Sequence, residues 1–390
     1  MTMKRVGLFG GSFNPPHLGH THSAAEAARQ LGLDMLIFMP TGNPPHKDLA
    51  NDSPASETRL ELVRLATCHI KGAAVMDYEI KRNQVSYTYD TVRELMSIYP
   101  GCELWILMGS DMFLYFPNWY RADWLLKNTS LAVFPRTDDL KEILTYAEKL
   151  QSEGANVRII NEQPLVISST SIRMLLAQRK GREYLSDIVY SYIIKNRLYG
   201  ALPDFDWLRR KVDMMMEPDR RAHVRGTENT AAELAVRWGV SEEDARTAAI
   251  LHDCTKRLGR SEQLNILKKY GTMSNISKMT ENLLLHSETA ACIAASRFGV
   301  SNEIADAIRY HTTGRAGMKV LEKVIYIADY IEPARQFPGV QTVRDLAFYD
   351  LDAAMIQALE NTLSEIKKRG IEPDKRTEDA LADLRRGHVL

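Results

Sequence analysis

The chain has few cysteines, no long apolar run and no excess of either charge. Its 390 residues contain four cysteines, which are Cys68, Cys102, Cys254 and Cys292. No two are close together, which argues against a disulfide framework or a cysteine-based zinc site and favours a reducing cytoplasm. No apolar run approaches the roughly 18 residues that span a bilayer, so we expect no membrane segment. Equal numbers of basic and acidic residues, 50 each, argue against a nucleic-acid-binding protein.

The first half alternates short apolar runs with helical patterns. The runs are almost entirely apolar, as strands buried on both faces are. They predict strands at Val6–Phe9, Met35–Met39, Ala73–Met76, Leu104–Met108, Leu131–Phe134 and Val157–Ile160. Strands alternating with helices indicate an α/β domain with a parallel, Rossmann-like sheet over residues 1–200. Ligands of such sheets bind beyond the carboxyl ends of the strands.

Strand patterns stop near Trp207, and amphipathic helices follow. We expect helices at Thr230–Trp238, Glu242–His252, Ser261–Tyr270, Glu281–Arg297, Asn302–His311, Leu321–Tyr330 and Leu351–Arg369. The second domain, residues 206–390, is therefore predicted to be an all-α helical bundle. The boundary is expected within Tyr199–Asp206, where Gly200 and Pro203 interrupt the pattern.

The loop after the first predicted strand has the character of a phosphate site. Gly10 and Gly11 carry no Cβ, so a phosphate can approach their backbone. His17 and His20 lie three residues apart at a helix start, where the free N–H groups also attract anions. The motif is neither GxGxxG nor GxxxxGK, which disfavours a dinucleotide fold and a P-loop.

A second phosphate-binding element is expected far along the chain. Ser168, Ser169, Thr170 and Ser171 cluster at a predicted helix start, and Arg173 follows within the first turn. Hydroxyl and N–H groups there can hold phosphate oxygens, and a guanidinium can neutralise charge in a transition state. Alone, the serines could be a plain capping box and His17 a satisfied loop histidine. Both elements lie at strand-to-helix turns, which favours one joint site.

These motifs carry a resemblance to the HxGH nucleotidyltransferases, and specifically to bacterial nicotinate-nucleotide adenylyltransferases. The stretch GGSFNPPHLGH at 10–20 and SSTSIR at 168–173 carry it, with PPHK at 44–47, SYT at 86–88, GSD at 109–111 and FPNW at 116–119. The resemblance covers residues 3–198. It implies the nucleotidyltransferase fold and transfer of AMP from ATP to nicotinate mononucleotide, giving deamido-NAD and pyrophosphate with Mg²⁺ required.

The resemblance also implies roles for individual residues. His17, His20 and Arg173 would act on the triphosphate, and Thr88, Trp119 and Lys47 would bind nicotinate mononucleotide. The remaining substrate or ATP-binding residues would be Gly10, Gly11, Ser12, Phe13, Gly109, Asp111, Ser168, Ser169 and Thr170. His46 could equally be a solvated loop residue. A related transferase that acts on phosphopantetheine or an alcohol phosphate would share the same two phosphate-binding motifs. The stretches PPHK and FPNW nevertheless favour nicotinate mononucleotide as the substrate.

The helical half has its own chemical signature, a series of metal-ligating residues spaced by about one helix each. The candidates are His223, His252, Asp253, His286, His311 and Asp329. Neighbouring helices could present them to one bundle core. Nitrogen and oxygen ligands without sulfur suit iron or manganese, and also zinc or magnesium. Two metals would suit hydrolysis of a phosphoester or phosphoanhydride, with Lys256 or Arg315 meeting a phosphate.

This half, about residues 207–370, resembles the HD-domain metallophosphohydrolases, particularly the YqeK type. The stretches RAHVRGT, AAILHDCTK, HSETAA, AIRYHTTGR and LEKVIYIADYIEPAR carry the resemblance. It implies a dinuclear iron site (Fe²⁺/Fe³⁺) with the six residues above as ligands. It also implies symmetrical cleavage of diadenosine tetraphosphate into two ADP, with Asp253 and Lys256 catalytic. The sequence itself does not distinguish between iron and manganese as the bound metal.

The two resemblances predict a bifunctional cytoplasmic enzyme, with other classes still to be distinguished. The helical half could instead bind a nucleotide and regulate the transferase, or hydrolyse another phosphorylated nucleotide. HD folds also occur in nucleases, but the balanced charge and the lack of a basic, aromatic-laced stripe argue against nucleic acid as a partner. The sequence leaves open whether the chain forms a homo-oligomer.

Overall fold

The computed structural model describes residues 4–43, 53–82, 84–135, 140–162, 165, 167–270 and 282–387. The chain divides into two compact units, Met1–Leu202 and Pro203–Leu390. The division falls inside the segment that Gly200 and Pro203 interrupt. Among the helices that the structure describes, none is long and apolar enough to cross a membrane.

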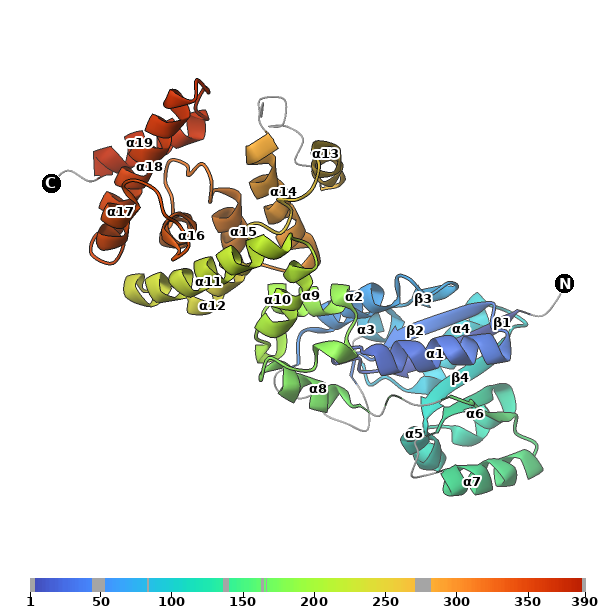
Figure 1. Ribbon diagram of the computed structural model, residues 1–390. Coiled ribbons are helices and arrows are strands. Elements are labelled where there is room, and N and C mark those ends of the chain that lie inside the picture. The colour runs from blue at the N-terminus through green and yellow to red at the C-terminus, as the bar shows by residue number, and fades with distance from the viewer. Residues whose placement is uncertain are drawn as a thin grey trace. The chain divides into compact units, whose positions relative to one another are not determined.

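The first unit is built on a six-stranded parallel sheet (Figure 1). Its strands are β1 (Arg5–Gly11), β2 (Met35–Pro40), β3 (Ala73–Val75), β4 (Glu103–Gly109), β5 (Ser130–Phe134) and β6 (Val157–Ile159). The strand order is β3-β2-β1-β4-β5-β6, so the direction of progression reverses between β1 and β4. The predicted parallel, Rossmann-like sheet is therefore confirmed.

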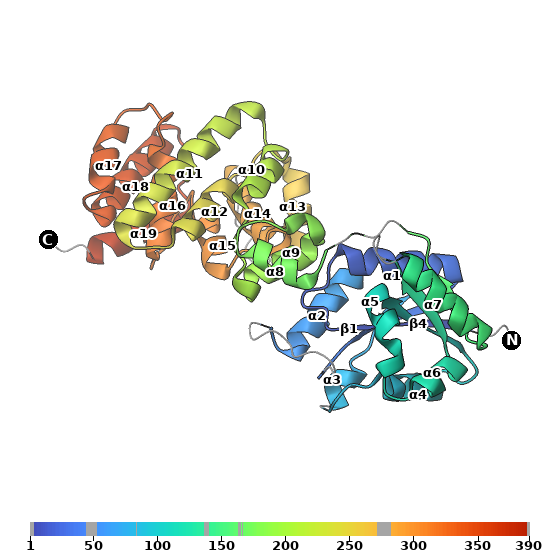
Figure 2. The same ribbon diagram turned by 90° about the horizontal axis from the view of Figure 1, so that it is seen from below.

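Helices cover both faces of this sheet because its strands are apolar on both sides. The unit's helices are α1 (Leu18–Leu31), α2 (Ser56–Thr67), α3 (Tyr78–Arg82), α4 (Thr88–Ile98), α5 (Ser110–Tyr115), α6 (Ala122–Asn128), α7 (Leu140–Ser152), α8 (Ser169–Leu176) and α9 (Asp187–Lys195), with 3₁₀ turns η1 (Phe116–Asn118), η2 (Arg182–Tyr184) and η3 (Leu198–Gly200). Figure 2 shows β1 and β4 between α1 and α2 on one side and α4 and α6 on the other. Alternate residues of β1 illustrate this, since Leu8 packs on one face and Phe9 on the other.

The second unit is helical throughout the part that the structure describes, as predicted. Its helices are α10 (Phe205–Asp213), α11 (Pro218–Trp238), α12 (Glu242–Leu251), α13 (Arg260–Lys269), α14 (Asn282–Arg297), α15 (Asn302–Arg309), α16 (Val320–Ile331), α17 (Val340–Ala347), α18 (Leu351–Lys368) and α19 (Lys375–Gly387). Within this unit α11 packs against α12 and α16, and α12 also packs against α15 (Figure 1).

The predicted start of α11 at Thr230 is wrong. The helix begins at Pro218, and Pro at the first turn suits a helix start because its missing N–H is not needed there. The added turns are mostly polar and contain Gly226, so they show no clear apolar period. Burial of Val224 and Thr227 against neighbouring helices fixes them as helix instead. The correction places His223 on a regular helix.

Candidate functional sites

The loop after β1 presents two stacked histidines at the start of α1. His17 is the N-cap of α1, and its ring centroid lies 3.6 Å from that of His20. The main-chain N–H of His17 donates to Nδ1 of His20 at 3.2 Å. Because this Nδ1 accepts, the neutral His20 ring carries its proton on Nε2, which can donate to a phosphate oxygen.

The environment keeps both imidazoles neutral. Burial lowers the pKa of His17 to about 4. Burial, and then repulsion from His17, hold the pKa of His20 well below its usual value. Nδ1 of His17 is buried without a hydrogen-bond partner among the residues that the structure describes. An anionic phosphate bound beside the pair would raise these pKa values, because it favours the protonated imidazole.

Small and aromatic residues fix the position of the two rings. A Cβ on Gly19 would lie 3.0 Å from two atoms of the His17 ring, so any larger residue there would press on the ring. The buried ring of Phe13 meets His20 edge-on with centroids 5.2 Å apart. Phe13 thus supports His20, and its ring is buried away from solvent. A Cβ on Gly10 would meet nothing within 4 Å, so space is open beside the backbone where β1 ends.

The serine-rich segment around α8 is joined to this loop by two hydrogen bonds. Oγ of Ser169 donates to the main-chain oxygen of Pro15 at 2.9 Å, and Nη1 of Arg173 donates to that of Asn14 at 2.8 Å. Ser168 caps α8 by accepting from the Ser171 N–H at 3.0 Å. Nη2 of Arg173 lies 3.4 Å from the Thr170 hydroxyl. Ser168 therefore caps the helix, and the same serine-rich segment also contacts the histidine loop.

Other predicted residues lie where neighbouring elements begin. Gly109 is the N-cap of α5, and a Cβ there would lie 2.8 Å from a carboxylate oxygen of Asp111. Since β1 and β4 are adjacent, these residues follow the strand next to the histidine loop. Thr88 is the first residue of α4, and Trp119 follows η1 with its ring centroid 5.1 Å from that of Phe116.

Two predicted contacts remain predictions. Lys47, expected to meet the phosphate of nicotinate mononucleotide, and His46 both lie outside the described residues.

Ser12 lies in the histidine loop, where its main-chain oxygen accepts a 2.8 Å hydrogen bond from Arg59 Nη1. Arg59 is fully buried on α2, and sequence reasoning missed it because an isolated arginine in a helix carries no motif.

In the second unit six predicted ligands converge on one point of the bundle core. Nε2 of His223 lies 2.9 Å from Oδ1 of Asp329 and 3.4 Å from Nε2 of His252. Nε2 atoms of His286 and His311 are likewise 3.4 Å apart. These pairs come from α11, α14, α16 and the turns that follow α12 and α15. The spacing of about one helix between ligands thus brings their donor atoms together.

Asp253 stands between the two histidine pairs. Its Oδ2 lies 3.3 Å from Nε2 of His252, and its Oδ1 lies 3.3 Å from Nε2 of His286. Oδ1 is buried without a hydrogen-bond partner among the described residues. Burial acts to raise the pKa of Asp253, but the surrounding imidazoles outweigh it and hold that pKa well below its usual range. One carboxylate oxygen therefore faces each pair, and these nitrogen and oxygen donors fit a metal site that Asp253 would help to hold.

Hydrogen bonds outside the cluster leave the inward nitrogens free to bind a metal. Nδ1 of His252 donates to the main-chain oxygen of Ala249, and Nδ1 of His311 donates to that of Ile308, both at 2.7 Å. A carbonyl oxygen only accepts, so Nδ1 carries the proton and Nε2 keeps its lone pair. His223 is oriented likewise by Oε1 of the buried Glu332, 3.0 Å from its Nδ1.

Cations surround the carboxylates of this cluster. Oδ2 of Asp253 accepts from Nε of Arg220 at 2.7 Å and from Nζ of Lys256 at 3.1 Å. Nη2 of Arg335 donates to Oδ1 of Asp329 at 2.8 Å. Arg315, a predicted phosphate contact, instead pairs with the buried Glu322 at 2.7 Å. Its position is therefore set by an internal ion pair.

Comparisons with known proteins match the two units separately. A Cytidylyltransferase-like family model matches residues 8–175, and an HD domain model matches residues 220–334. A "Probable nicotinate-nucleotide adenylyltransferase" of Neisseria meningitidis is 38% identical over 202 residues, which are 50% of this chain and 99% of the relative. A protein of the same name from Listeria innocua is 35% identical over 196 residues, 50% of this chain and 97% of the relative.

The chain belongs to the nicotinate-nucleotide adenylyltransferase family. Its second unit carries an HD domain that contains all six converging ligands. A solved structure from Clostridium acetobutylicum, described as a "predicted HD superfamily hydrolase involved in NAD metabolism", is 31% identical, with a TM-score of 0.46. It corresponds to 48% of this chain and 100% of that one.

Several residues of the HD domain were missed in the sequence, for one shared reason. Arg220, Glu332 and Arg335 contact predicted ligands and are not predicted ligands themselves, so only their contacts identify them. A weak signal existed, because Glu332 and Arg335 lie in the quoted stretch that contains Asp329. Gly226 is a second weak signal, because a glycine inside a helix often marks close packing. Here a Cβ would lie 2.6 Å from Oε2 of Glu332.

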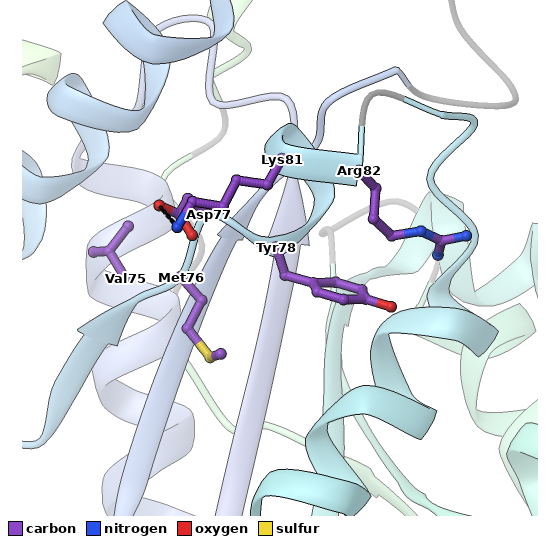
Figure 3. Close-up of a pocket in the computed structure, with 6 residues that line it drawn as sticks. All are labelled: Val75, Met76, Asp77, Tyr78, Lys81 and Arg82. Carbon is purple, nitrogen blue, oxygen red and sulfur yellow. Dashed lines mark ion pairs between the residues drawn. The ribbon is translucent and has the colours of Figure 1, made fainter.

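The adenylyltransferase unit also has a pocket that no motif indicated. It has a volume of about 530 Å³ and is lined by Val75, Met76, Asp77, Tyr78, Lys81 and Arg82. Figure 3 shows Lys81 reaching toward Asp77, with which it forms an ion pair of 3.1 Å. None of the predicted site residues lines it, so the pocket is distinct from the histidine loop.

Proposed function

We propose that the first unit transfers AMP from ATP to nicotinate mononucleotide, producing deamido-NAD and pyrophosphate. The observation that carries this proposal is the identity of 38% along 99% of a relative named for that activity. The geometry supports it, because His17, His20 and Arg173 surround the loop at the point where the strand order reverses. Mg²⁺ would accompany ATP as the counter-ion of its triphosphate.

In this proposal the protein positions reactants and stabilises charge. The phosphate of nicotinate mononucleotide attacks the α-phosphorus of ATP, the bond to the β-phosphate oxygen breaks, and pyrophosphate leaves. Nε2–H of His20 would donate to a phosphate oxygen. Arg173 would neutralise the charge that develops on the oxygens around the α-phosphorus. Trp119 would stack on the pyridine ring, which its half-buried indole can do.

The test is a coupled assay with the purified chain, ATP, Mg²⁺ and nicotinate mononucleotide. Formation of deamido-NAD and pyrophosphate in equal amounts would support the proposal. Phosphopantetheine or an alcohol phosphate, offered in place of nicotinate mononucleotide, would identify a different acceptor. Nicotinamide mononucleotide at matched concentration would measure the preference for the nicotinate carboxylate.

For the second unit we propose metal-dependent, symmetrical hydrolysis of diadenosine tetraphosphate to two ADP. The convergence of six ligand side chains carries the proposal. His223, His252, Asp329 and Oδ2 of Asp253 would hold one metal ion. His286, His311 and Oδ1 of Asp253 would hold the other. Two iron ions, or manganese in their place, would supply positive charge for the phosphoanhydride and lower the pKa of a water molecule.

The chain's own cations complete the proposed hydrolytic site. Arg220 and Lys256 both donate to Asp253 in the described structure, so they lie beside the cluster and could turn to substrate phosphates. Incubation of the iron-loaded chain with diadenosine tetraphosphate, followed by chromatography, tests the proposal. ADP as sole product supports symmetrical cleavage. ATP plus AMP indicates an asymmetric hydrolase, and no turnover with metal bound favours a regulatory nucleotide-binding domain.

A further inference from the structure

A buried carboxylate in the adenylyltransferase unit belongs to none of the residues assigned above. Glu79 lies on the short helix α3 and is only 7% exposed. Its Oε1 accepts a hydrogen bond of 2.7 Å from the Thr91 hydroxyl of α4. The hydroxyls of Ser86 and Thr41 lie near it as well and favour its charged form. Burial raises the pKa of Glu79, so these donors offset part of a real desolvation cost.

The donor Thr91 and the two nearby hydroxyls come from segments that frame one end of the proposed acceptor site. Ser86 and Thr91 flank Thr88, the first residue of α4. Thr41 follows β2 and precedes the PPHK stretch. Ser86 N–H also donates to the main-chain oxygen of Asn43 at 2.9 Å, which joins the two segments directly. Glu79 therefore holds together the segment that starts α4 and the segment that leaves β2.

Thr41 extends this connection to the phosphate loop. Its N–H donates to the main-chain oxygen of Gly11 at 2.9 Å, and its own main-chain oxygen accepts from Nη2 of Arg59 at 2.8 Å. Arg59 also donates to the main-chain oxygen of Ser12, so this buried arginine hydrogen-bonds to both loops. The contacts run from the histidine loop through Thr41 to Glu79 and then to α4.

The backbone segments of this region are packed closely together. A Cβ on Gly42 would lie 2.5 Å from the main-chain oxygen of Glu79, so the β2 segment lies against α3 itself. On the outer side Arg82 of α3 forms a 3.1 Å ion pair with Asp90 of α4. Figure 3 shows Tyr78 and Arg82 pointing the same way from α3, away from the Asp77–Lys81 pair.

We propose that Glu79 is a positioning residue for the acceptor nucleotide, acting through Thr91, Ser86 and Thr41. This inference rests on the function proposed for the first unit. Glu79 sets the distance between the start of α4, where nicotinate would bind, and the loop that would hold the triphosphate. Its loss changes the affinity for nicotinate mononucleotide, while the ATP-binding residues after β4 and in α8 keep their contacts.

The test compares Michaelis constants for both substrates in four variants. Glu79→Gln removes the charge and replaces one acceptor oxygen with an amide donor, and Thr91→Val removes the hydroxyl donor at nearly constant volume. Both are expected to raise KM for nicotinate mononucleotide about tenfold and KM for ATP less than twofold. Thr91→Ser keeps the hydroxyl and restores the wild-type value. Asp77→Asn, a half-exposed carboxylate two residues before Glu79, changes neither constant.

Thermal unfolding of each variant separates positioning from general loss of structure. Equal increases in both Michaelis constants with a falling Tm would overturn the inference, as would unchanged constants in Glu79→Gln. Both results presuppose an active wild-type chain. A wild-type protein that forms no deamido-NAD would overturn the proposed function itself, and the positioning role with it.

Discussion

Nη1 of Arg173 donates a 2.8 Å hydrogen bond to the main-chain oxygen of Asn14, 159 residues earlier in the chain. The same guanidinium therefore joins the two phosphate elements and stands beside the proposed triphosphate. We expect Arg173→Lys to keep the charge but lose the forked geometry, and to lower kcat for deamido-NAD formation on the order of 100-fold. KM for ATP should change much less. Met174→Ala, an exposed neighbour on α8, is the control; equal losses in both variants would contradict the assigned role.

The low pKa of His17 predicts a dependence of stability on pH. The imidazole has a pKa of about 4 when folded and its ordinary value of 6.5 when unfolded. Between these values the unfolded chain binds a proton that the folded chain does not, so the free energy of unfolding falls as pH decreases from 6.5 to about 4. By pH 5 the loss is about 2 kcal/mol.

Urea unfolding at pH 7 and pH 5 measures this effect in wild type and His17→Gln. The wild-type chain should lose about 2 kcal/mol more than the variant between the two pH values. NMR of ¹³C-labelled histidine rings provides a direct check, since the signal absent from His17→Gln identifies His17. A titration of that signal near pH 6.5 would show that the ring is not buried as described.

Gly19 and Gly10 predict contrasting effects of the same substitution. Gly19→Ala places a methyl group 3.0 Å from the His17 ring, which must move, and kcat should fall on the order of 100-fold. Gly10→Ala meets nothing in the free protein, so Tm should hold while KM for ATP rises, because the methyl occupies space proposed for phosphate. Kinetics and thermal unfolding of both variants check this. A fall in Tm for Gly10→Ala would mean that the space beside Gly10 is filled.

Much of the fold was predictable because buried strands and capped helices leave local patterns. All six predicted strands are present, since each is an apolar run between loops, interrupted only by Arg158 in the last. The first turns of α11 were not predictable, because burial of Val224 and Thr227 by other helices decides their conformation. Glu79 and Arg59 were invisible for a related reason. A carboxylate or guanidinium acquires its role from the groups that surround it, and those groups are distant in sequence.

The position of Asp253 predicts that one substitution would empty the whole of the proposed metal site. Asp253→Asn removes the charge that faces both histidine pairs, so metal content measured by mass spectrometry should fall at both positions together. Hydrolysis of diadenosine tetraphosphate should fall at least about 100-fold while deamido-NAD formation continues. Asp345→Asn on α17 is the control, since that carboxylate pairs with Gln341 at the surface. Loss of only half the metal would argue against a shared carboxylate.

Glu332 and Glu322 are two buried carboxylates at opposite ends of α16, and they should separate metal affinity from stability. Oε1 of Glu332 orients the His223 ring, so Glu332→Gln should weaken metal binding about 10- to 100-fold, as measured by competition with a chelator. Glu322 pairs with Arg315 and touches no predicted ligand. Glu322→Gln should therefore lower Tm without changing metal affinity. Metal affinities that fall equally in both variants would show that the cluster responds to the packing of α16 rather than to the hydrogen bond on His223.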